Sequence, residues 1–168
     1  MDADFLLIQR MKAGDESAVE SFVRKHYPQI LQYCRYRAGE WAEDATQETF
    51  VRFFDSFDRY RHCGKAVNYL YVIAGNVCRD AARRNREFPA AEPPVEAAVD
   101  TAGLRVDLLR ALDRLPPELR EAALLFFAQG LKQREIARIQ GVGLPLVKYR
   151  IRRAREALAA EFEGGELY

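Results

Sequence analysis

The sequence predicts an all-α fold of two small helical domains that are joined by an acidic, proline-containing linker. Apolar residues recur at i, i+3, i+4 and i+7 in several segments, and no segment alternates apolar and polar residues as a half-buried strand does. Between Glu87 and Thr101, three of the seven prolines and four acids interrupt the periodic pattern, without any Lys or Arg. The length of 168 residues, 49% of them apolar, suits one domain or two small ones.

The first domain is expected at residues 1–86, as a bundle of about four helices. A helix from Phe5 to Lys12 ends before Gly14, and Asp15 can cap the next helix, whose apolar stripe ends at Cys34. Two further helices follow from apolar residues at helical spacing. Their stripes are Phe50, Phe53, Phe54 and Phe57 in one helix, and Leu70, Ile73, Ala74 and Val77 in the other.

Residues 87–101 are interpreted as an exposed linker, and the second domain is expected at residues 102–168. Leucines at 104, 108 and 112 predict a short helix. Pro116 and Pro117 end it and open another helix that runs to Gly130. Residues 132–140, a turn at 141–143 and a final helix from about Leu144 to Phe162 together predict a helix-turn-helix.

Charge and cysteine content exclude several classes of protein. The net charge is +1, so any affinity for nucleic acid must be local. Three separated cysteines, Cys34, Cys63 and Cys78, do not form a disulfide framework, which favours a reducing cytoplasm. The N-terminus carries acids where a signal peptide needs positive charge, and the longest apolar run, Ala122 to Ala128, is too short to cross a bilayer. A cytoplasmic protein without membrane insertion is therefore expected.

The final helix has one apolar and one basic face. Val147, Ile151, Ala154 and Leu158 share the apolar side, while Lys148, Tyr149, Arg152 and Arg153 centre on the opposite side. Five basic residues and no acid lie between Lys148 and Arg155, as expected of a helix that enters a major groove. A solvated basic face is the alternative, but the preceding helix and glycine turn favour DNA binding.

A second polar stripe lies on the helix expected at about 66–86. Its members are Asn76, Arg79, Asp80 and Arg83. The loop before this helix mixes aromatic and basic residues that can stack an unpaired base and hold its phosphate. The loop runs from Tyr60 to Lys65 and includes Arg61 and His62. It is followed by Asn68, Tyr69 and Tyr71 at the start of the helix. The alternatives are that the arginines interact only with the helix dipole and that the tyrosines cover the core.

Acidic residues cluster at the start of the Phe-rich helix. They are Glu40, Glu43, Asp44 and Glu48, with Gln47 among them, and they either complement the helix dipole or form a docking patch for a basic partner. No nucleotide-binding loop or nucleophile motif occurs, and His62 beside Cys63 lacks further metal ligands at usable spacing. We therefore expect neither an enzyme nor a bound metal or cofactor.

Two sets of motifs resemble those of one known family. Residues 12–15 (KAGD) with Tyr27-Pro28, 42–50 (AEDATQETF) and 69–76 (YLYVIAGN) are similar to region 2 of the extracytoplasmic-function (ECF) group of sigma-70 factors. Residues 115–122 (LPPELREA), 130–137 (GLKQREIA) and 147–155 (VKYRIRRAR) are similar to region 4. Region 4 alone resembles many helix-turn-helix regulators, but both sets stand here in the family's order.

The resemblance implies a subunit that binds bacterial RNA polymerase core and directs it to promoters. Asp44, Gln47 and Glu48 would dock on the polymerase clamp, and region 4 would also touch the flap. The loop and polar stripe of region 2 would engage the −10 element and hold the separated strand. Lys148, Tyr149, Arg152 and Arg153 would enter the −35 major groove, with Arg134 near phosphate. An anti-sigma factor as inhibitory partner is a further implication.

The sequence departs from the family pattern at three positions. Tyr69 stands where Trp is usual, Gly75 replaces a frequent basic residue, and Pro145 with Leu146 replaces a small residue and Thr. A tyrosine can still stack on a base, whereas contacts near Leu146 must differ. Two other hypotheses stay open, a stand-alone helix-turn-helix regulator and a helical adaptor that binds only proteins. Salt-dependent duplex binding by the isolated chain would indicate the former.

Overall fold

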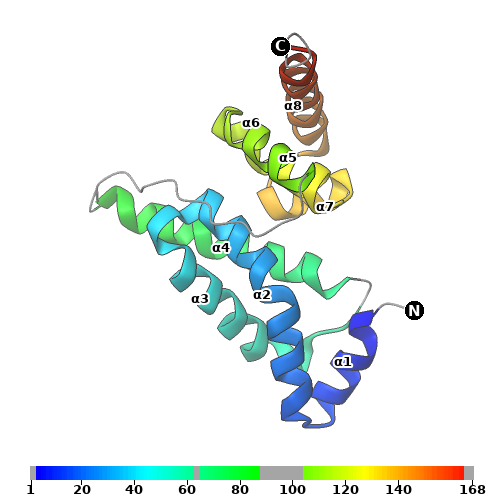
Figure 1. Ribbon diagram of the computed structural model, residues 1–168. Helices are drawn as coiled ribbons and strands as arrows, with labels where there is room; N and C mark the ends of the chain where they lie inside the picture. Colours follow the sequence, from blue (N-terminus) through cyan, green and yellow to red (C-terminus); the bar gives the residue numbers. More distant parts are fainter. Residues whose placement is uncertain (1–2, 63–64, 88–103, 165–168) are drawn as a thin grey trace. The chain divides into compact units, whose positions relative to one another are not determined.

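The computed structural model describes residues 3–62, 65–87 and 104–164 of the chain. Over these ranges every regular element is helical, which confirms the all-α prediction (Figure 1). The chain divides into two units, Met1–Val95 and Glu96–Tyr168. The predicted linker at 87–101 lies, apart from Glu87, outside the described residues. Of the helices described, none has the length and hydropathy to cross a membrane.

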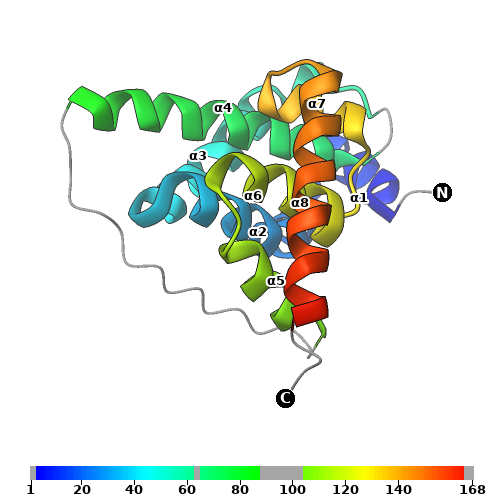
Figure 2. The same ribbon diagram turned by 90° about the horizontal axis from the view of Figure 1, so that it is seen from above.

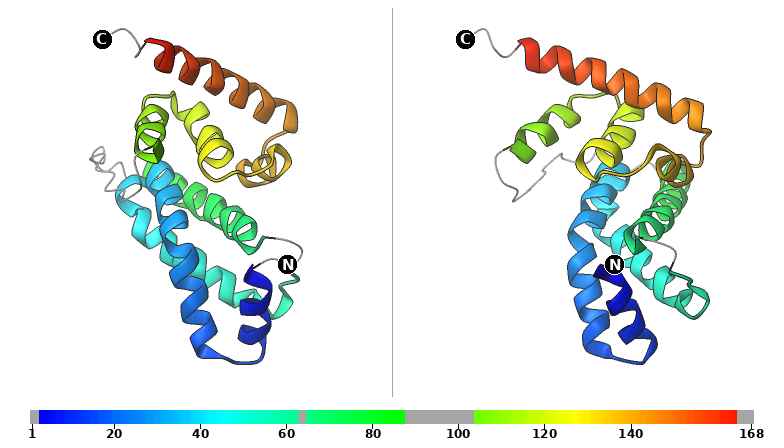
Figure 3. Two further views of the ribbon diagram at one scale, coloured as in Figure 1. Left: turned by 45° about the vertical axis from the view of Figure 1, so that its right-hand side comes forward. Right: turned by 90° about the vertical axis from the view of Figure 1, so that its right-hand side faces the viewer.

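The first unit is a bundle of four α-helices: α1 (Ala3–Lys12), α2 (Glu16–Ala38), α3 (Ala42–Asp55) and α4 (Ala66–Glu87). Short 3-10 turns at Gly39–Trp41 and Phe57–Arg59 flank α3. Helix α2 packs against the other three, and α3 also packs against α4. Figure 2 shows α4 lengthwise, and Figure 3 shows α1 folded back along the first half of α2.

The turn between α1 and α2 has the capping chemistry that the sequence predicts. Gly14 has φ +85°, a conformation that side chains disfavour, and it lets the chain reverse. The Asp15 carboxylate then accepts hydrogen bonds from the backbone N–H of Ser17 and Ala18, at 3.0 and 3.3 Å. The Ser17 hydroxyl and the Arg10 guanidinium also donate to it, and these bonds lower the pKa of Asp15 to about 2.

Aromatic rings fill the centre of the first unit. Phe53 is fully buried and stacks on Phe22 with ring centroids 5.1 Å apart. The predicted stripe of α4 also points inward, since Leu70, Ile73, Ala74 and Val77 are all buried. The buried thiols of Cys34 on α2 and Cys78 on α4 meet with their Sγ atoms 3.9 Å apart, and their hydrogen bond lowers the pKa of Cys34.

Helix α1 is held to α2 by a buried carboxylate. Asp4 Oδ1 lies 2.6 Å from Lys25 Nζ and 3.0 Å from His26 Nε2. Burial alone would raise the pKa of Asp4, but its bonds to Lys25 and His26 outweigh burial and lower it. Because α1 is fixed in this way, its last residue, Lys12, can reach the loop that follows α3, where its Nζ donates to the Tyr60 carbonyl at 2.9 Å.

The second unit contains α5 (Leu104–Asp113), α6 (Pro117–Ala123), α7 (Gln133–Gln140) and α8 (Leu144–Gly164). The single helix expected from Pro117 to Gly130 is instead α6 followed by a π-helical turn at Leu124–Ala128. There the N–H of Gln129 bonds to the Leu124 carbonyl, five residues back, at 3.1 Å. The wider turn keeps Leu124 and Leu125 fully in the core.

Helix α8 closes the second unit by packing on α5, α6 and α7. Its predicted apolar stripe is buried in full: Val147, Ile151, Ala154 and Leu158 are at most 6% exposed. Ile136 and Ile139 of α7 are fully buried as well. The opposite side of α8 is therefore the side that the unit leaves to solvent.

Candidate functional site

The exposed face of α8 carries the predicted DNA-contacting side chains. Lys148, Tyr149, Arg152 and Arg153 are all exposed. The Arg152 guanidinium lies over the Tyr149 ring, 5.7 Å from its centroid. Arg153 reaches Glu156 at 3.2 Å, but both side chains are more than half exposed, so this pair binds weakly. The structure thus brings together one tyrosine and three cations on one side of one helix.

A glycine turn orients α8 against α7. Gly141 has φ +65°, and Val142 N–H bonds to the Ala137 carbonyl at 3.1 Å, which ends α7 in a left-handed cap. Arg150 Nη1 donates to Gln140 Oε1 at 3.2 Å and joins the two helices next to the turn. At the other end of α7, Lys132 N–H donates to the Glu135 carboxylate at 2.7 Å. These contacts fix the angle between the helices of the helix-turn-helix.

Arg134 lies in the first turn of α7 and is exposed. It is therefore on the surface of the same helix-turn-helix as the α8 residues. Residues at the start of the first helix commonly contact the DNA backbone, while the second helix enters the groove. Its exposed position in the first turn of α7 agrees with a phosphate contact.

The polar stripe on α4 is less free than its sequence indicates. Arg79 Nη2 donates to Asn76 Oδ1 at 2.5 Å, so these neighbours form a local pair. Asp80 Oδ2 lies 3.2 Å from Arg52 Nη1 of α3, which ties the stripe to the adjacent helix. Arg83 is exposed near the end of α4. Three of the four predicted residues thus have a partner: Asn76 and Arg79 bond to each other, and Asp80 bonds to a residue of the neighbouring helix.

The loop before α4 is anchored at its beginning. Tyr60 is 9% exposed, and its hydroxyl lies 3.0 Å from His62 Nδ1. Arg61 and Lys65 are exposed on either side of residues 63–64, which lie outside the described residues. Asn68, in the first turn of α4, is half-buried. The cationic side chains of this loop therefore face solvent while its aromatic residue packs inward.

Tyr69 lies at the edge of the aromatic core. Its ring stacks on Tyr60 with centroids 5.3 Å apart and planes at 25°, and it also contacts Phe53. Its hydroxyl lies 3.3 Å from Ser56 Oγ. The residue is nevertheless 36% exposed. The position of Tyr69 thus agrees with both interpretations of the sequence, because the residue covers the core and is also partly exposed to solvent.

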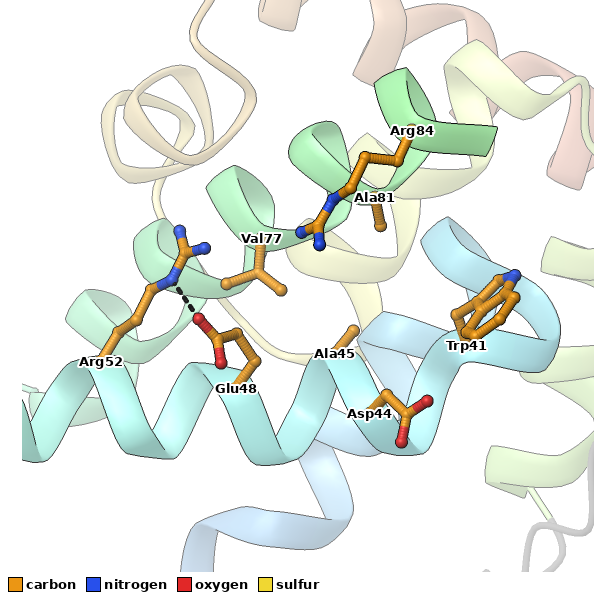
Figure 4. A pocket seen from close by; sticks show the side chains of 8 residues that line it. All are labelled: Trp41, Asp44, Ala45, Glu48, Arg52, Val77, Ala81 and Arg84. Atoms are coloured by element: carbon orange, nitrogen blue, oxygen red, sulfur yellow. Dashed lines mark hydrogen bonds and ion pairs between the residues drawn. The ribbon is translucent and has the colours of Figure 1, made fainter. Parts of the chain in front are cut away.

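The acidic residues predicted to dock a partner lie along a cleft between α3 and α4 (Figure 4). The cleft encloses about 540 Å³ and is lined by Trp41, Asp44, Ala45, Glu48, Arg52, Val77, Ala81 and Arg84. Asp44 and Gln47 are exposed on α3, about two turns and one turn before Val51, which is itself 52% exposed. Trp41 is 42% exposed at one end. The surface is thus mixed, with an aromatic ring, an aliphatic side chain and carboxylates.

Arg52 links this cleft to the polar stripe of α4, a role that its sequence position did not reveal. Its Nε donates to Glu48 at 2.7 Å and its Nη1 to Asp80 at 3.2 Å. The hydrogen bonds to Glu48 and Asp80 raise the pKa of Arg52, so it remains charged. Lys12 was likewise missed as the residue that holds the loop. For the Glu48–Arg52 ion pair, the four-residue spacing on one helix was the signal that the sequence offered.

The described residues hold no group of three or more His, Cys, Asp or Glu side chains that could bind a metal ion. His62 contacts the Tyr60 hydroxyl and the Phe5 ring, whose centroid lies 6.2 Å from that of the imidazole.

Comparison with known families matches both units. Residues 22–88 match the family description Sigma-70 region 2, and residues 105–158 match Sigma-70, region 4. The chain is 35% identical over 162 residues to the ECF RNA polymerase sigma factor SigE of Mycolicibacterium smegmatis, covering 86% of this chain and 63% of that protein. It is 32% identical over 161 residues to the RNA polymerase sigma factor CarQ of Myxococcus xanthus, covering 90% of this chain and 92% of that protein.

Solved structures show the same fold. The sigma factor RpoE of Bartonella quintana, in complex with the anti-sigma factor NepR, superposes with a TM-score of 0.71 at 22% identity, covering 88% of this chain and 98% of that one. CnrH, in complex with the cytosolic domain of CnrY, has a TM-score of 0.65 at 25% identity, covering 98% of this chain and 100% of that one. The arrangement of helices is therefore shared with proteins of this kind.

Proposed function

This chain belongs to the ECF group of the sigma-70 family, and we propose that it binds bacterial RNA polymerase core and directs transcription initiation at specific promoters. The observation that carries the proposal is the pairing of two units in one chain. One has a partly exposed aromatic ring beside a cationic loop, and the other has a basic helix-turn-helix face. A stand-alone regulator needs only the second.

We assign residues 1–86 to a region 2 domain, residues 87–101 to a linker and residues 102–168 to a region 4 domain. In this division the first domain docks on polymerase and opens the −10 element, and the second reads the −35 element. The family matches at 22–88 and 105–158 support this division, as does the change in composition between them.

The −35 element is assigned to the exposed face of α8. Cations on a helix that enters the major groove contact guanines and phosphates, and each good base contact contributes about 1–3 kcal/mol of discrimination. Lys148, Arg152 and Arg153 supply these cations, and Tyr149 supplies a flat ring between them. Arg134 of α7 contacts a backbone phosphate in this arrangement.

The −10 element is assigned to the loop before α4 and to the polar stripe that follows it. Tyr69 offers its exposed ring edge and face to an unpaired base, and the loop cations hold the phosphates. The residues concerned are Arg61, His62, Lys65, Asn68, Tyr69, Asn76, Arg79, Asp80 and Arg83. Each base pair step costs about 1.4 kcal/mol to open, and each stacked base returns about 1–3 kcal/mol. A few captured bases offset only part of this cost.

Polymerase supplies the remaining stabilisation. Asp44, Gln47 and Glu48 form the acidic surface for its clamp, and the second domain also touches its flap. The net charge of +1 supports this dependence, since a nearly neutral chain gains little from counterion release on DNA by itself. The protein acts in the cytoplasm, where polymerase is, and works by binding rather than by catalysing a reaction. By analogy with the RpoE–NepR complex, an anti-sigma factor is its inhibitory partner.

The test combines the full chain with purified core polymerase and a library of genomic promoter fragments. Run-off products that require both components are the expected result, with weak, nonspecific DNA binding by the chain alone. Asp44→Arg together with Gln47→Arg is expected to reduce capture of core while the fold is kept, because both side chains are exposed. The melting temperature should fall only slightly, since Asp44 lies in the first turn of α3 and complements the helix dipole. Exposed Glu20→Arg on α2 is the matched control. Tight, specific duplex binding by the chain without polymerase would indicate the stand-alone regulator instead.

A further inference from the structure

The DNA-facing side of α8 is not purely cationic. Leu146 is 40% exposed and Tyr149 is 49% exposed, although most large apolar side chains of the second unit are buried. They are three residues apart and so lie on neighbouring positions of one helix face. At about 100° per residue, Tyr149 points away from the buried stripe, and Leu146 lies about 60° from Tyr149 around the helix and about 110° from the centre of the stripe. Neither side chain belongs to the described core of the unit.

Position along the helix determines what Leu146 can contact. Helix α8 begins at Leu144, so Leu146 is in its first turn, and Arg152 and Arg153 follow two turns later. In a helix-turn-helix the N-terminal residues of the second helix contact base edges, while residues farther along reach the backbone. An aliphatic side chain cannot hydrogen-bond a base, but it can contact the one apolar group in the major groove, the C5-methyl of thymine.

The neighbours of Leu146 hold this surface in position. Pro145 fixes the first turn of the helix, and Val147 N–H bonds to the Gly143 carbonyl at 3.3 Å. The Arg152 guanidinium sits over the Tyr149 ring, 5.7 Å from its centroid, and limits the motion of the ring. A leucine and a tyrosine ring side by side thus form a small apolar surface that is bordered by cations, which attract phosphates on both sides of the groove.

We propose that Leu146, supported by the Tyr149 ring, reads the methyl group of a thymine in the −35 element. This inference rests on the proposed function and deepens it by naming a base and the residue that distinguishes it. A thymine is preferred over cytosine or uracil at that position because only thymine offers the methyl group. Burial of one methyl group on the apolar surface corresponds to about a fourfold gain in affinity.

The experiment removes the methyl group from the DNA and the leucine from the protein. Holoenzyme made from the full chain first selects its −35 sequence from a randomised promoter library. Each thymine of that element, on either strand, is then replaced singly by 2′-deoxyuridine, and holoenzyme affinity is measured. With the wild-type chain, one replacement is expected to weaken binding about fourfold. With Leu146→Ala the same replacement should leave the affinity unchanged, whereas Leu146→Met should retain the wild-type response.

The control is the same substitution at another exposed leucine. Leu6 on α1 is 61% exposed and belongs to the first unit, so Leu6→Ala should respond to uracil as the wild type does. The proposal is overturned if no thymine responds, or if Leu146→Ala responds as strongly as the wild type. It is also overturned if Leu146→Ala weakens only the binding of a protein partner. Failure of the chain to form a holoenzyme would instead refute the proposed function.

Discussion

Replacing Tyr69 tests its proposed role of presenting a ring to an unpaired base. Tyr60 stacks on the ring, and only 36% of the residue is exposed, so there is room for one base. One base stacked on an aromatic ring contributes about 1–3 kcal/mol, which corresponds to a factor of about 5 to 150 in the stability of the open complex. Tyr69→Ala is expected to lose this factor. Tyr69→Phe keeps the ring and loses only the contact with Ser56, so it should remain close to wild type.

Two measurements on holoenzyme test this expectation. Permanganate reactivity of unpaired thymines reports the open complex on duplex promoter, and titration with a fluorescent single-stranded −10 oligonucleotide reports base capture. Tyr69→Ala should weaken both by a similar factor, while closed-complex formation at low temperature stays unchanged. If Tyr69→Ala and Tyr69→Phe have equal effects, or if the single-strand affinity of Tyr69→Ala equals that of wild type, base stacking by this ring is refuted.

Three further outcomes are expected. Arg152→Ala should weaken promoter binding by about 1–3 kcal/mol without lowering the melting temperature, since its side chain is exposed; a lower melting temperature would contradict its assignment to DNA. Phe53→Ala should lower the free energy of unfolding of the first unit by about 3–5 kcal/mol in denaturant titrations, because the ring is fully buried. A decrease below about 1 kcal/mol would show that the aromatic cluster contributes little to stability. The pKa of Asp15 is lowered from 3.8 to about 2, so its contribution to stability is complete above pH 3.8 and is lost as the pH falls toward 2. In acid titrations of unfolding, Asp15→Ala should therefore lose less stability than the wild type over that interval. An unchanged acid transition would contradict the capping role.

The helical organisation was accessible from the sequence because it depends on local patterns. The caps at Asp15 and Gly141 and the apolar stripes of α4 and α8 follow from residue type and spacing, and the structure confirms them. The π-helical turn at Leu124–Ala128 was not predicted, since an unbroken apolar run has no periodicity that distinguishes it from an α-helix.

Contacts between helices were the part of the site that sequence could not provide. Spacing placed the four stripe residues on one face of α4, but it could not show that Asp80 pairs with Arg52 of α3, 28 residues away. Lys12 reaches the Tyr60 carbonyl across 48 residues. Such pairs depend on how the helices pack, which spacing within one helix does not determine. The roles assigned to these residues on DNA and polymerase stay predictions.

The arginine between Glu48 and Asp80 affects how an interface scan of this chain should be designed. Charge reversal at Glu48 would change the side of α3 that is proposed to dock on polymerase. It would also leave Arg52 with a single carboxylate partner, Asp80 on α4, the helix proposed to contact DNA. A defect seen in such a variant would therefore combine two causes, one at each macromolecular contact. Arg52 bonds to Glu48 and Asp80, so substitutions at Asp44 and Gln47 separate the effects. A double-mutant cycle between Arg52 and Asp80 measures how strongly the two surfaces are coupled.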